Sequence, residues 1–450
     1  MAGLPVYFEQ RVVGTIDVDR NGPGFTYDPG WIGLRGAFPV STTMPLAPNR
    51  IGSDTFLPWA ANLLPENEQL RTLGQLLGMA RSDVIGLLSA IGGDTAGALS
   101  FGQPGRTSSV QWRPVGTPDE LETVLEDLPN KPFLVGEEGV SMSLAGAQTK
   151  LAVAVDQDGR ICIPMNGSPS THILKPDSPR LPGGVQNEAF CLTLARRMNI
   201  PMPDIATGKT GNRTYLLVKR YDRTDVGGRW RRLHQEDYCQ ALGKPPSAKY
   251  ESNQTGIRGP TLKDMFEVTR RHLPATDIIR LLDMVVVNVL TCNTDAHAKN
   301  YSIMIRGNGA TLAPMYDIMC GEVWNNVTKN FAQKIAGKSR GDDLAGKDWQ
   351  RFARECGLNP RQVIDRVGVL AKSAMAEAGV AACEVAAMPA GPHEMLEPAR
   401  QAVERRAQAL LTQLQELRDE AAVKTVEADA RPAGEEPALE GSGAAAHIRK

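Results

Sequence analysis

Residues Thr294-Asp295-Ala296-His297-Ala298-Lys299-Asn300 directly follow the apolar run Leu281–Cys292, and the assignment of the fold depends on them. The apolar run predicts a buried helix, and the heptapeptide predicts a polar loop after it. Asp295 and His297 could be a pair of metal ligands, and Thr294 with Asp295 could cap a helix. A capping or structural role is the commoner one for such a loop, so its function has to be decided by the rest of the chain.

The overall composition indicates a soluble, globular chain with several domains. Its 450 residues predict two or three domains, and 42% hydrophobic and 22% charged residues are ordinary values. The net charge of −1 gives no sign of a nucleic-acid or membrane surface, although it does not exclude DNA contact through a partner. Seven scattered cysteines argue against a disulfide framework. Met1–Pro5 lacks the pattern of a signal peptide, and residues 281–290 are too short to span a bilayer, so we expect a cytoplasmic protein.

The N-terminal part of the chain changes from strand to helix patterns. Residues 4–27 alternate and contain turn residues, which predicts strands, and the apolar spacing from Asp54 onward predicts three helices. The glycine-rich segment Ile91–Leu99 lacks the Gly-Lys-Ser/Thr ending of a phosphate loop, so we interpret it as closely packed backbone. Low periodicity over Gln103–Gly116 indicates a linker. We therefore predict a first domain over 1–104 and a linker over 105–138.

The segment after the linker could cover phosphate groups. Val140–Ser143 predicts a strand, Leu144–Thr149 a short loop of small residues, and Lys150–Val155 a returning strand. Backbone N–H groups of such a loop can approach phosphate oxygens, and Lys150 would add a positive charge. An ordinary hairpin has the same pattern, so this prediction needs support from elsewhere in the chain.

Two charged residues give that support. Lys175 ends the β-type run Thr171–Lys175, and Glu188 lies in the first turn of a helix predicted over Gln186–Met198. A strand lysine followed by an early helical glutamate is the order of the ion pair that aims the lysine of kinases at the α- and β-phosphates. Taken separately, a solvated lysine and a glutamate favoured by the helix dipole would explain the two residues.

The heptapeptide continues this order. Asp295 and Asn300 are five positions apart, as are the proton-accepting aspartate and the metal-binding asparagine in the catalytic loop of protein kinases. A hairpin predicted over 301–315 then leads to Tyr316 and Asp317, where a kinase places a second metal carboxylate. Oxygen ligands from Asn300 and Asp317, together with ATP phosphates, are a sufficient set for Mg²⁺.

Three further segments complete the pattern. The strand Tyr215–Val218 ends at Lys219–Tyr221, where a kinase chain crosses between its lobes and offers backbone groups to adenine. Gln235–Asp237 could contact substrate, although capping of a helix is the commoner role. Helical patterns extend to Val423, and the Ala-, Gly-, Pro- and Glu-rich end predicts a disordered tail over 426–450.

The segments that carry a family resemblance occur in one order along the chain: Leu63–Glu66 (LLPE), Ile91–Leu99 (IGGDTAGAL), Ser143–Lys150 (SLAGAQTK), Thr171–Lys175 (THILK), Asn187-Glu188, Gln235–Asp237 (QED), Thr294–Asn300 (TDAHAKN) and Tyr316–Ile318 (YDI). With these segments the chain resembles the HipA family, serine/threonine kinases that are the toxins of bacterial toxin–antitoxin pairs. The resemblance runs from about residue 4 to the C-terminal helices and leaves out the tail.

The resemblance implies an α+β, two-lobed protein-kinase-like fold related to lipid kinases. An N-terminal α/β domain would be appended to the small lobe, which spans 139–225 and carries the phosphate loop. The mostly helical large lobe would span 226–425 and carry the catalytic loop.

The resemblance also implies a role for each matching residue. Asp295 would be the proton acceptor, Asn300 and Asp317 would bind magnesium, and Ser143 matches a serine that family members autophosphorylate, which swings the loop out and silences the enzyme. Lys219 stands where some relatives have an acidic residue, which leaves backbone contacts to adenine unaffected. The residues implied for ATP, with Glu188 in support of Lys175, are Ala145, Gly146, Ala147, Gln148, Thr149, Lys150, Lys175, Lys219, Arg220, Tyr221, His297, Ala298, Lys299, Asn300, Tyr316 and Asp317.

The function implied is that of an ATP- and Mg²⁺-dependent serine/threonine kinase acting as a toxin. Its substrate would be a protein hydroxyl, in some family members that of an aminoacyl-tRNA synthetase. Its partner would be a small helix-turn-helix antitoxin similar to HipB, through which it would meet DNA, and no membrane is implied. A small-molecule or lipid kinase with the same site, and a non-catalytic corepressor working with a DNA-binding antitoxin, are the alternatives.

Overall fold

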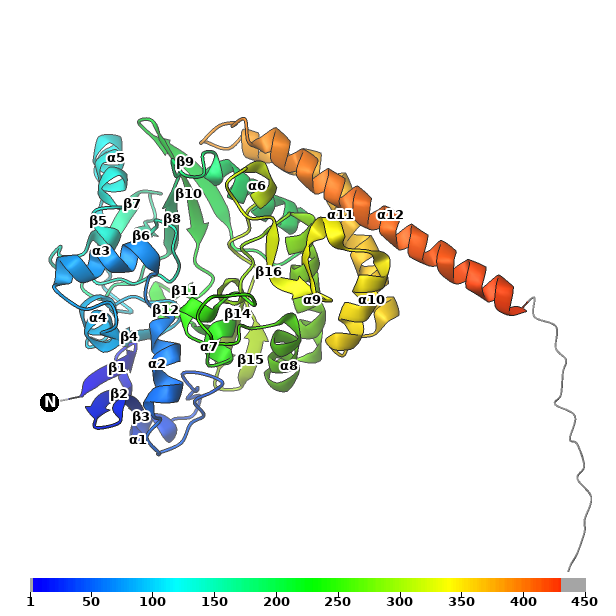
Figure 1. Cartoon of the computed structure of the whole chain (residues 1–450). Helices are drawn as coiled ribbons and strands as arrows, with labels where there is room; N and C mark the ends of the chain where they lie inside the picture. The colour runs from blue at the N-terminus through cyan, green and yellow to red at the C-terminus, as the bar shows by residue number, and fades with distance from the viewer. Residues whose placement is uncertain (1–2, 430–450) are drawn as a thin grey trace, which may run out of the picture.

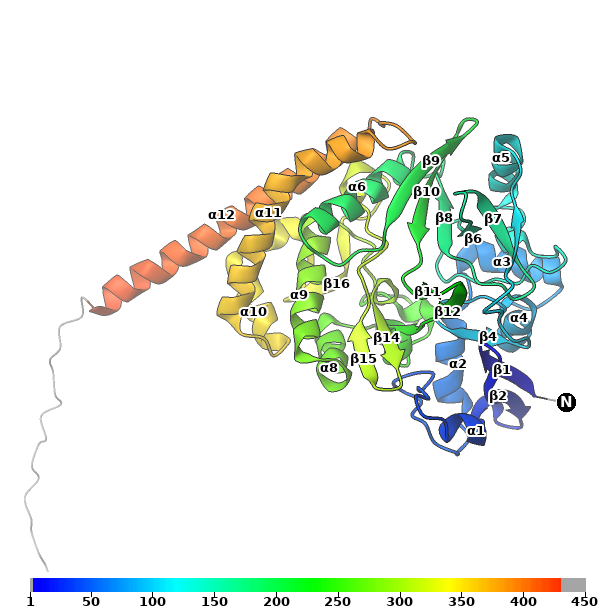
Figure 2. The same cartoon turned by 180° about the vertical axis from the view of Figure 1, so that it is seen from behind.

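Three parts follow one another along the chain in the computed structural model, which describes residues 3–429 and their side chains as far as residue 420. An N-terminal domain, drawn in blue in Figure 1, lies beside a small lobe built on a sheet and a large lobe built mainly of helices. Figure 2 shows the same three parts from behind. Within residues 3–429, no helix combines the length and the apolar character that crossing a bilayer requires.

The N-terminal domain packs helices on an antiparallel sheet with the strand order β3-β2-β1-β4. Asp83 caps a helix here by accepting a hydrogen bond from the N–H of Gly86. Phe25, Phe56 and Trp59 fill the space between sheet and helices. The elements are β1 (Leu4–Phe8), β2 (Arg11–Asp19), β3 (Gly22–Tyr27), α1 (Pro29–Ile32), α2 (Ser53–Ala61), α3 (Asn67–Leu77), α4 (Val84–Ile91) and β4 (Leu99–Phe101).

The small lobe is an antiparallel sheet of six strands in the order β5-β7-β6-β8-β10-β9, with two helices packed against it (Figure 1). Its strands β6 and β8 are almost entirely buried because they lie in the middle of the sheet. The elements are β5 (Gln111–Pro114), α5 (Pro118–Asp127), β6 (Leu151–Val155), β7 (Ile161–Met165), β8 (His172–Pro176), α6 (Gly184–Arg197), β9 (Ile205–Thr210) and β10 (Arg213–Lys219).

Two sequence-based expectations about this lobe differ from the structure. Residues 105–138, expected to be a linker, contain β5, which pairs with β7, and the amphipathic helix α5. Leu121 and Leu125 of α5 are buried in the core of the lobe, and a helix of only ten residues shows this periodicity weakly. Val140–Ser143, expected to be a strand, forms no ladder, because Ser143 bonds instead to loops of the N-terminal domain.

The large lobe surrounds the buried helix α9 (Ala275–Leu290), which confirms the predicted apolar helix before the heptapeptide. The hairpin β14–β15 follows the heptapeptide as expected and pairs with β13. The other elements are β11 (Arg223–Val226), β12 (Arg229–Arg232), β13 (His234–Asp237), α7 (Tyr238–Ala241), α8 (Leu262–His272), β14 (Ser302–Arg306), β15 (Gly309–Leu312), β16 (Asn330–Ile335), β17 (Lys338–Arg340), α10 (Gly346–Glu355), α11 (Pro360–Ala386) and α12 (Leu396–Asp429).

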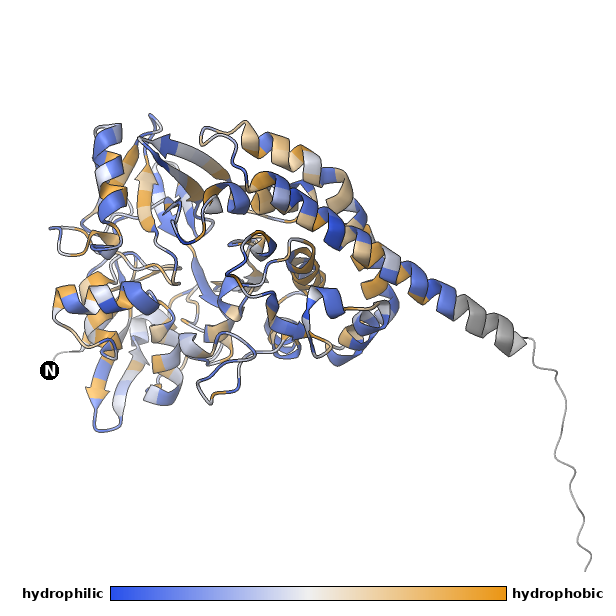
Figure 3. Ribbon diagram, turned by 45° about the horizontal axis from the view of Figure 1, so that its top comes forward, coloured by the Kyte–Doolittle hydropathy of each residue, from blue (hydrophilic) through white to orange (hydrophobic). Residues whose placement is uncertain are grey.

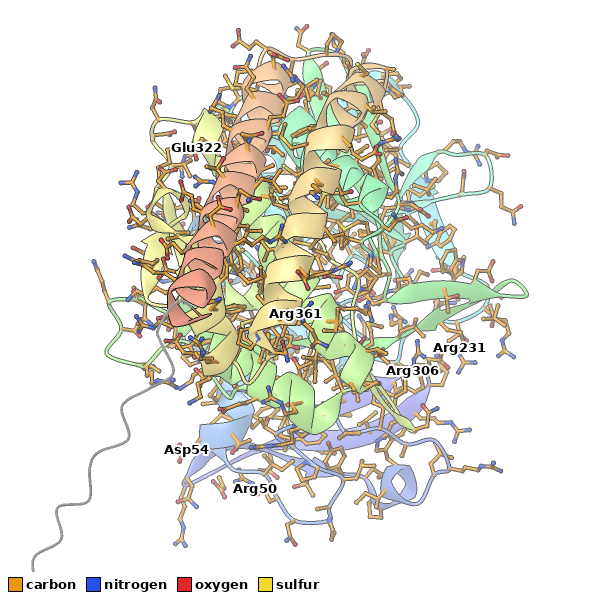
Figure 4. All side chains as sticks on the ribbon, turned by 90° about the vertical axis from the view of Figure 1, so that its right-hand side faces the viewer. Arg50, Asp54, Arg231, Arg306, Glu322 and Arg361 are labelled. Atoms are coloured by element: carbon orange, nitrogen blue, oxygen red, sulfur yellow. The ribbon has the colours of Figure 1, made fainter. Side chains whose placement is uncertain are left out.

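The two long helices α11 and α12 pack side by side on the outside of the large lobe. Figure 4 looks onto them, with Arg361 in the first turn of α11 and the N-terminal domain, marked by Arg50 and Asp54, below. Hydrophilic and hydrophobic residues alternate along α12, as Figure 3 shows. The helix continues six residues beyond the expected end at Val423, and the rest of the predicted tail, residues 430–450, lies outside the described residues.

The N-terminal domain contacts both lobes, whereas the resemblance placed it on the small lobe. Gln240 of α7 donates to the carbonyl oxygen of Trp59 at 3.0 Å, and Asn62 donates to that of Lys244 at 2.8 Å. On the small-lobe side, the N–H of Ser143 donates to the carbonyl oxygen of Asp94 at 2.9 Å. The domain therefore closes one wall of the space between the lobes.

Candidate active site

A cavity of about 1120 Å³ lies where the three parts meet, and it contains the predicted site. Asp295, Glu188 and the residues expected to bind ATP line it, with the exception of Ala298. Ala298 is fully buried, and its N–H donates to the carbonyl oxygen of Lys249. Segments from residue 62 to residue 319 contribute to the wall, so tertiary packing assembles the site.

Lys175 connects two carboxylates at the back of the cavity. Its Nζ, on β8, donates to Glu188 Oε1 of α6 at 2.7 Å and to Asp317 Oδ1 at 2.5 Å. Burial acts to lower the pKa of Lys175, but the two carboxylates outweigh it and raise the pKa, so the ammonium is charged at neutral pH. Burial likewise acts to raise the pKa of Asp317, and the charges of Lys175 and Lys150 outweigh it and hold that pKa low. The expected ion pair of Lys175 and Glu188 is thus formed.

Asp317 is held in an unusual backbone conformation. Its φ of +57° lies in the left-handed region, which is costly for a residue with a side chain. Asn187 of α6 fixes the following segment, because its side chain donates to the carbonyl oxygen of Cys320 and accepts from the N–H of Cys320. Helix α6 therefore holds both the glutamate that pairs with Lys175 and the segment that carries Asp317.

The loop 145–150 lines the cavity. Lys150 Nζ donates to the carbonyl oxygen of Ala145 at 2.8 Å, which closes the loop on itself. Gly146 has a φ of +104°, and a Cβ atom there would lie 2.8 Å from Lys150 Nζ, so the turn requires glycine. Burial, with Lys175 nearby, lowers the pKa of Lys150 to about 8. The loop therefore presents a cation that an anion would stabilise.

The heptapeptide lines the same cavity and is connected to α9 by hydrogen bonds. Asn293 donates to Asn288 Oδ1 at 2.8 Å, and the N–H of Asp295 donates to Asn293 Oδ1 at 3.2 Å. The Asp295 side chain is 64% exposed, and its Oδ1 accepts from the hydroxyl of Tyr250 at 2.5 Å. The surrounding protein desolvates the carboxyl group and raises its pKa, while the Tyr250 hydrogen bond acts to lower it. A carboxylate with a raised pKa, open to the cavity, can accept a proton.

Asn300 and Asp317 have free oxygen atoms that fit a hard divalent cation. Asn300 Nδ2 donates to the carbonyl oxygen of Asp295 at 2.9 Å, which fixes the amide, and no hydrogen bond to its Oδ1 exists within residues 3–420. Asp317 Oδ2 is equally unbonded in that range. Mg²⁺ binds through one or two such groups together with phosphates and water, so these residues fit it.

The segment Lys219–Tyr221 has one free backbone donor for a base. The N–H groups of Lys219 and Arg220 already donate to Asp204 and Thr171, and the Arg220 side chain pairs with Asp222 at 2.7 Å. In the described part of the chain, the N–H of Tyr221 has no such acceptor. The ring of Tyr221 lies 5.7 Å from that of Tyr316, and both rings line the cavity. Of the three residues expected at adenine, Tyr221 is the one with both a free N–H and a ring at the site.

His297 and Lys299 differ in what they offer a nucleotide. His297 is buried and neutral, because desolvation holds its pKa well below 6.5, and its Nδ1 has no hydrogen-bond partner among the described residues. The ammonium of Lys299 is already bound, to Asn62 Oδ1 at 2.7 Å and to Asp237 Oδ2 at 3.0 Å. The Lys299 side chain therefore joins the large lobe to the N-terminal domain and is not directed at a phosphate. No group of three His, Cys, Asp or Glu side chains suited to a metal occurs among the described residues, so nothing there supports Asp295 and His297 as a pair of metal ligands.

Three residues at the site were missed by sequence reasoning. Glu66, Lys249 and Tyr250 line the cavity, and Lys249 Nζ pairs with Glu66 Oε2 at 2.7 Å. Glu66 ends one of the segments that carry the family resemblance, which was a usable signal. Lys249 and Tyr250 lie in a polar segment without periodicity, so nothing in the sequence pattern distinguished them from an ordinary loop.

The chain is similar in sequence to known proteins of one family. The HipA N-terminal domain matches residues 4–102, and the HipA-like C-terminal domain matches residues 142–378. "Putative kinase Y4mE" of Sinorhizobium fredii is 36% identical over 82% of this chain and 89% of its own length. The serine/threonine-protein kinase toxin HipA of Shewanella oneidensis is 30% identical over 80% of this chain and 84% of its own length.

A solved structure agrees with these matches. The complex of HipA, HipB and operator DNA from Shewanella oneidensis MR-1 contains a chain that superposes with a TM-score of 0.80 at 27% identity, covering 92% of this chain and 99% of that one. The predicted α+β, two-lobed kinase-like fold is therefore confirmed. With both family domains matched in order, this chain belongs to the HipA family of kinases.

Proposed function

We propose that this protein is a serine/threonine protein kinase that uses ATP and Mg²⁺. One observation carries the proposal: Lys175 pairs with both Glu188 and Asp317 in the cavity that also holds Asp295 and Asn300. Separate structural roles would explain each residue alone, but they would not bring all five to one cavity. This is the set of groups that positions a nucleotide and an acceptor hydroxyl for phosphoryl transfer.

Each side chain has a definite task in this reaction. Lys175 and Lys150 would bind the phosphate oxygens of ATP, and Asn300 and Asp317 would hold Mg²⁺, which would neutralise phosphate charge. The acceptor oxygen forms a bond to the γ-phosphorus as the bond to ADP breaks. The hydroxyl proton passes to Asp295, whose Oδ2 is unbonded in the described chain and open to the cavity.

We also propose Ser143 as a site of autophosphorylation. Its side chain is fully buried, and its hydroxyl donates to the carbonyl oxygen of Leu63 at 2.8 Å. A phosphate group has no room or partner there, so segment 141–144 must leave the N-terminal domain before and after modification. Because this segment leads into the loop 145–150, phosphorylation would displace the loop and silence the enzyme.

The proposed biological role is that of the toxin in a toxin–antitoxin pair in the cytoplasm. The name of the Shewanella relative and the HipB and operator DNA in the solved complex support this role. We propose a HipB-like helix-turn-helix protein as partner, DNA contact mainly through that partner, and no contact with a membrane. The proposed substrate is a translation component such as an aminoacyl-tRNA synthetase, on the basis of the family resemblance.

The variant Asp295→Asn tests the proposal directly. Loss of the proton acceptor is expected to lower phosphoryl transfer by about 10²- to 10⁴-fold while ATP still binds. Intact mass after incubation with Mg·ATP counts the phosphate groups added, peptide mapping tests whether they are at Ser143, and calorimetry measures ATP binding. Asp54→Asn, at an exposed position of α2, is the matched control and is expected to retain the parental rate. Phosphorylation of Asp295→Asn at the parental rate would refute the proposal.

A further inference from the structure

Glu66 of the N-terminal domain contacts both loops that frame the cavity. Its N–H donates to the carbonyl oxygen of Gly146 in the phosphate loop at 3.1 Å. Its carboxylate Oε2 accepts from Lys249 Nζ at 2.7 Å, and both side chains are about nine-tenths buried. Its other oxygen, Oε1, has no partner among the described residues, so the contact with Lys249 is the one hydrogen bond that the carboxylate makes there.

Lys249, the partner of Glu66, and the adjacent Tyr250 both contact the catalytic loop. The carbonyl oxygen of Lys249 accepts from the N–H of Ala298 at 3.3 Å, inside the heptapeptide. Tyr250, the next residue, donates its hydroxyl to Asp295 Oδ1 at 2.5 Å and places its ring edge-on to His297, with 5.2 Å between ring centroids. A continuous series of contacts therefore runs from the N-terminal domain to the proposed proton acceptor.

The Asp295 carboxylate depends on Tyr250 for its orientation. The side chain is 64% exposed, and the Tyr250 hydroxyl is its one hydrogen-bond donor within residues 3–420. An exposed carboxylate without that contact rotates among several rotamers, because no other hydrogen bond to its side-chain oxygens occurs within residues 3–420. With Oδ1 occupied by Tyr250, Oδ2 is the oxygen left for an acceptor hydroxyl.

We propose that Glu66 and Tyr250 are positioning residues for phosphoryl transfer, and that through Lys249 the N-terminal domain sets the orientation of Asp295 relative to the phosphate loop. This inference rests on the proposed kinase function. The ion pair of Glu66 and Lys249 is buried, so it has one arrangement, and its loss leaves a buried ammonium without its counter-charge. The loops on the two sides of the cavity are therefore fixed relative to each other by a residue outside both lobes.

The variant Tyr250→Phe removes the hydroxyl and keeps the ring. We expect kcat to fall by about 10- to 100-fold because the proton acceptor is no longer aligned, with the KM for ATP unchanged within about twofold. Tyr7→Phe, on strand β1 of the N-terminal domain, is the matched control. A fall in kcat accompanied by an equal rise in KM and by a lower melting temperature would indicate a merely structural role and would overturn the inference.

The ion pair is tested with graded changes. Glu66→Gln and Lys249→Met are expected to lower kcat in the same way as Tyr250→Phe. Lys249→Arg keeps the charge and is expected to retain most of the parental kcat. Because Glu66 and Tyr250 act through the same contacts, the double variant is expected to be no slower than the worse single variant by more than about twofold. Glu267→Gln, which removes the partner of Lys263 on the exposed side of α8, is the control. Fully additive losses would contradict the inference.

Hydrogen exchange separates this inference from the proposed function. In Glu66→Gln, peptides covering residues 249–251 and 293–300 are expected to exchange faster than in the parent and in Glu267→Gln, since a link to the N-terminal domain is lost. Unchanged exchange in both peptides overturns the inference even if the parent is an active kinase. A parent that transfers no phosphate refutes the proposed function, and the exchange measurement then still decides whether Glu66 holds the catalytic loop.

Discussion

Burial determines the protonation state of Glu236. It is 1% exposed, and its two oxygens accept from Ser41 Oγ at 2.6 Å and from the N–H of Thr42 at 2.9 Å. With no cation among these partners, desolvation raises the pKa of Glu236 to about 7. The carboxyl group therefore holds its proton in the folded protein at pH values where the unfolded chain has lost it.

This shift predicts a specific dependence of stability on pH. Because the folded state binds the proton more tightly, the stabilisation is complete below the unfolded pKa of 4.5 and is lost as pH rises through about 7. Neighbouring His234 acts in the opposite direction, because burial lowers its pKa to about 4. The measurement is therefore urea unfolding of the parent and of Glu236→Gln at pH 5 and pH 8.

From pH 5 to pH 8, the free energy of unfolding of the parent is expected to fall by up to about 3 kcal/mol more than that of Glu236→Gln. The effect of His234 is common to both proteins and cancels in the difference. Equal pH dependence in the two proteins would show that Glu236 is ionised in the folded state at neutral pH.

At the scale of elements, the loop between the Ser143 segment and β6 is the one that we propose to hold phosphate. Gly146→Ala is expected to raise the KM for ATP about tenfold, since a positive φ with a side chain costs about 1–3 kcal/mol and the new Cβ displaces Lys150. Gly159→Ala, in the turn between β6 and β7, also has a positive φ but no neighbour within 4 Å. That control is expected to lose stability without a change in KM, and an equal change in both variants would contradict the role of the loop.

At the scale of the whole molecule, a buried charge cluster joins the N-terminal domain to the kinase lobes. Asp94, in the glycine-rich segment 91–99, accepts from Arg223 at 2.8 Å and from Arg232 at 3.2 Å, and all three side chains are at most 2% exposed. Burial acts to raise the pKa of Asp94, but the arginines outweigh it and hold the pKa low. The segment expected to be closely packed backbone also supplies the central charge of an interdomain contact.

Asp94→Asn is expected to destabilise the protein by about 3–5 kcal/mol, because it leaves the buried guanidinium of Arg232 without its counter-charge and leaves Arg223 with Asp222 alone. Asp17→Asn removes a partner of Arg50 at a half-exposed site and is expected to cost about 1 kcal/mol or less. The midpoint and slope of denaturant unfolding measure both changes. Equal losses in the two variants would show that the cluster does not join the domains.

The sequence by itself determined the order of the site residues. Lys175, Glu188, Asp295 and Asp317 each adjoin a strand or helix with a clear periodic pattern, so local spacing was enough to place them in kinase order. Their convergence on one cavity follows from that order once the fold is known. Their assignment as proton acceptor and ligands stays a prediction until the variants above are measured.

Only the tertiary structure shows which distant segments these residues contact. It turned the Lys299 ammonium toward Asn62, built β5 and α5 into the small lobe, and paired Glu66 with Lys249 across 183 positions of the chain. Spacing in a sequence reports on neighbours within one helix or strand, because those contacts repeat with its period. Contacts between distant segments depend on how whole elements pack, and no local pattern records them.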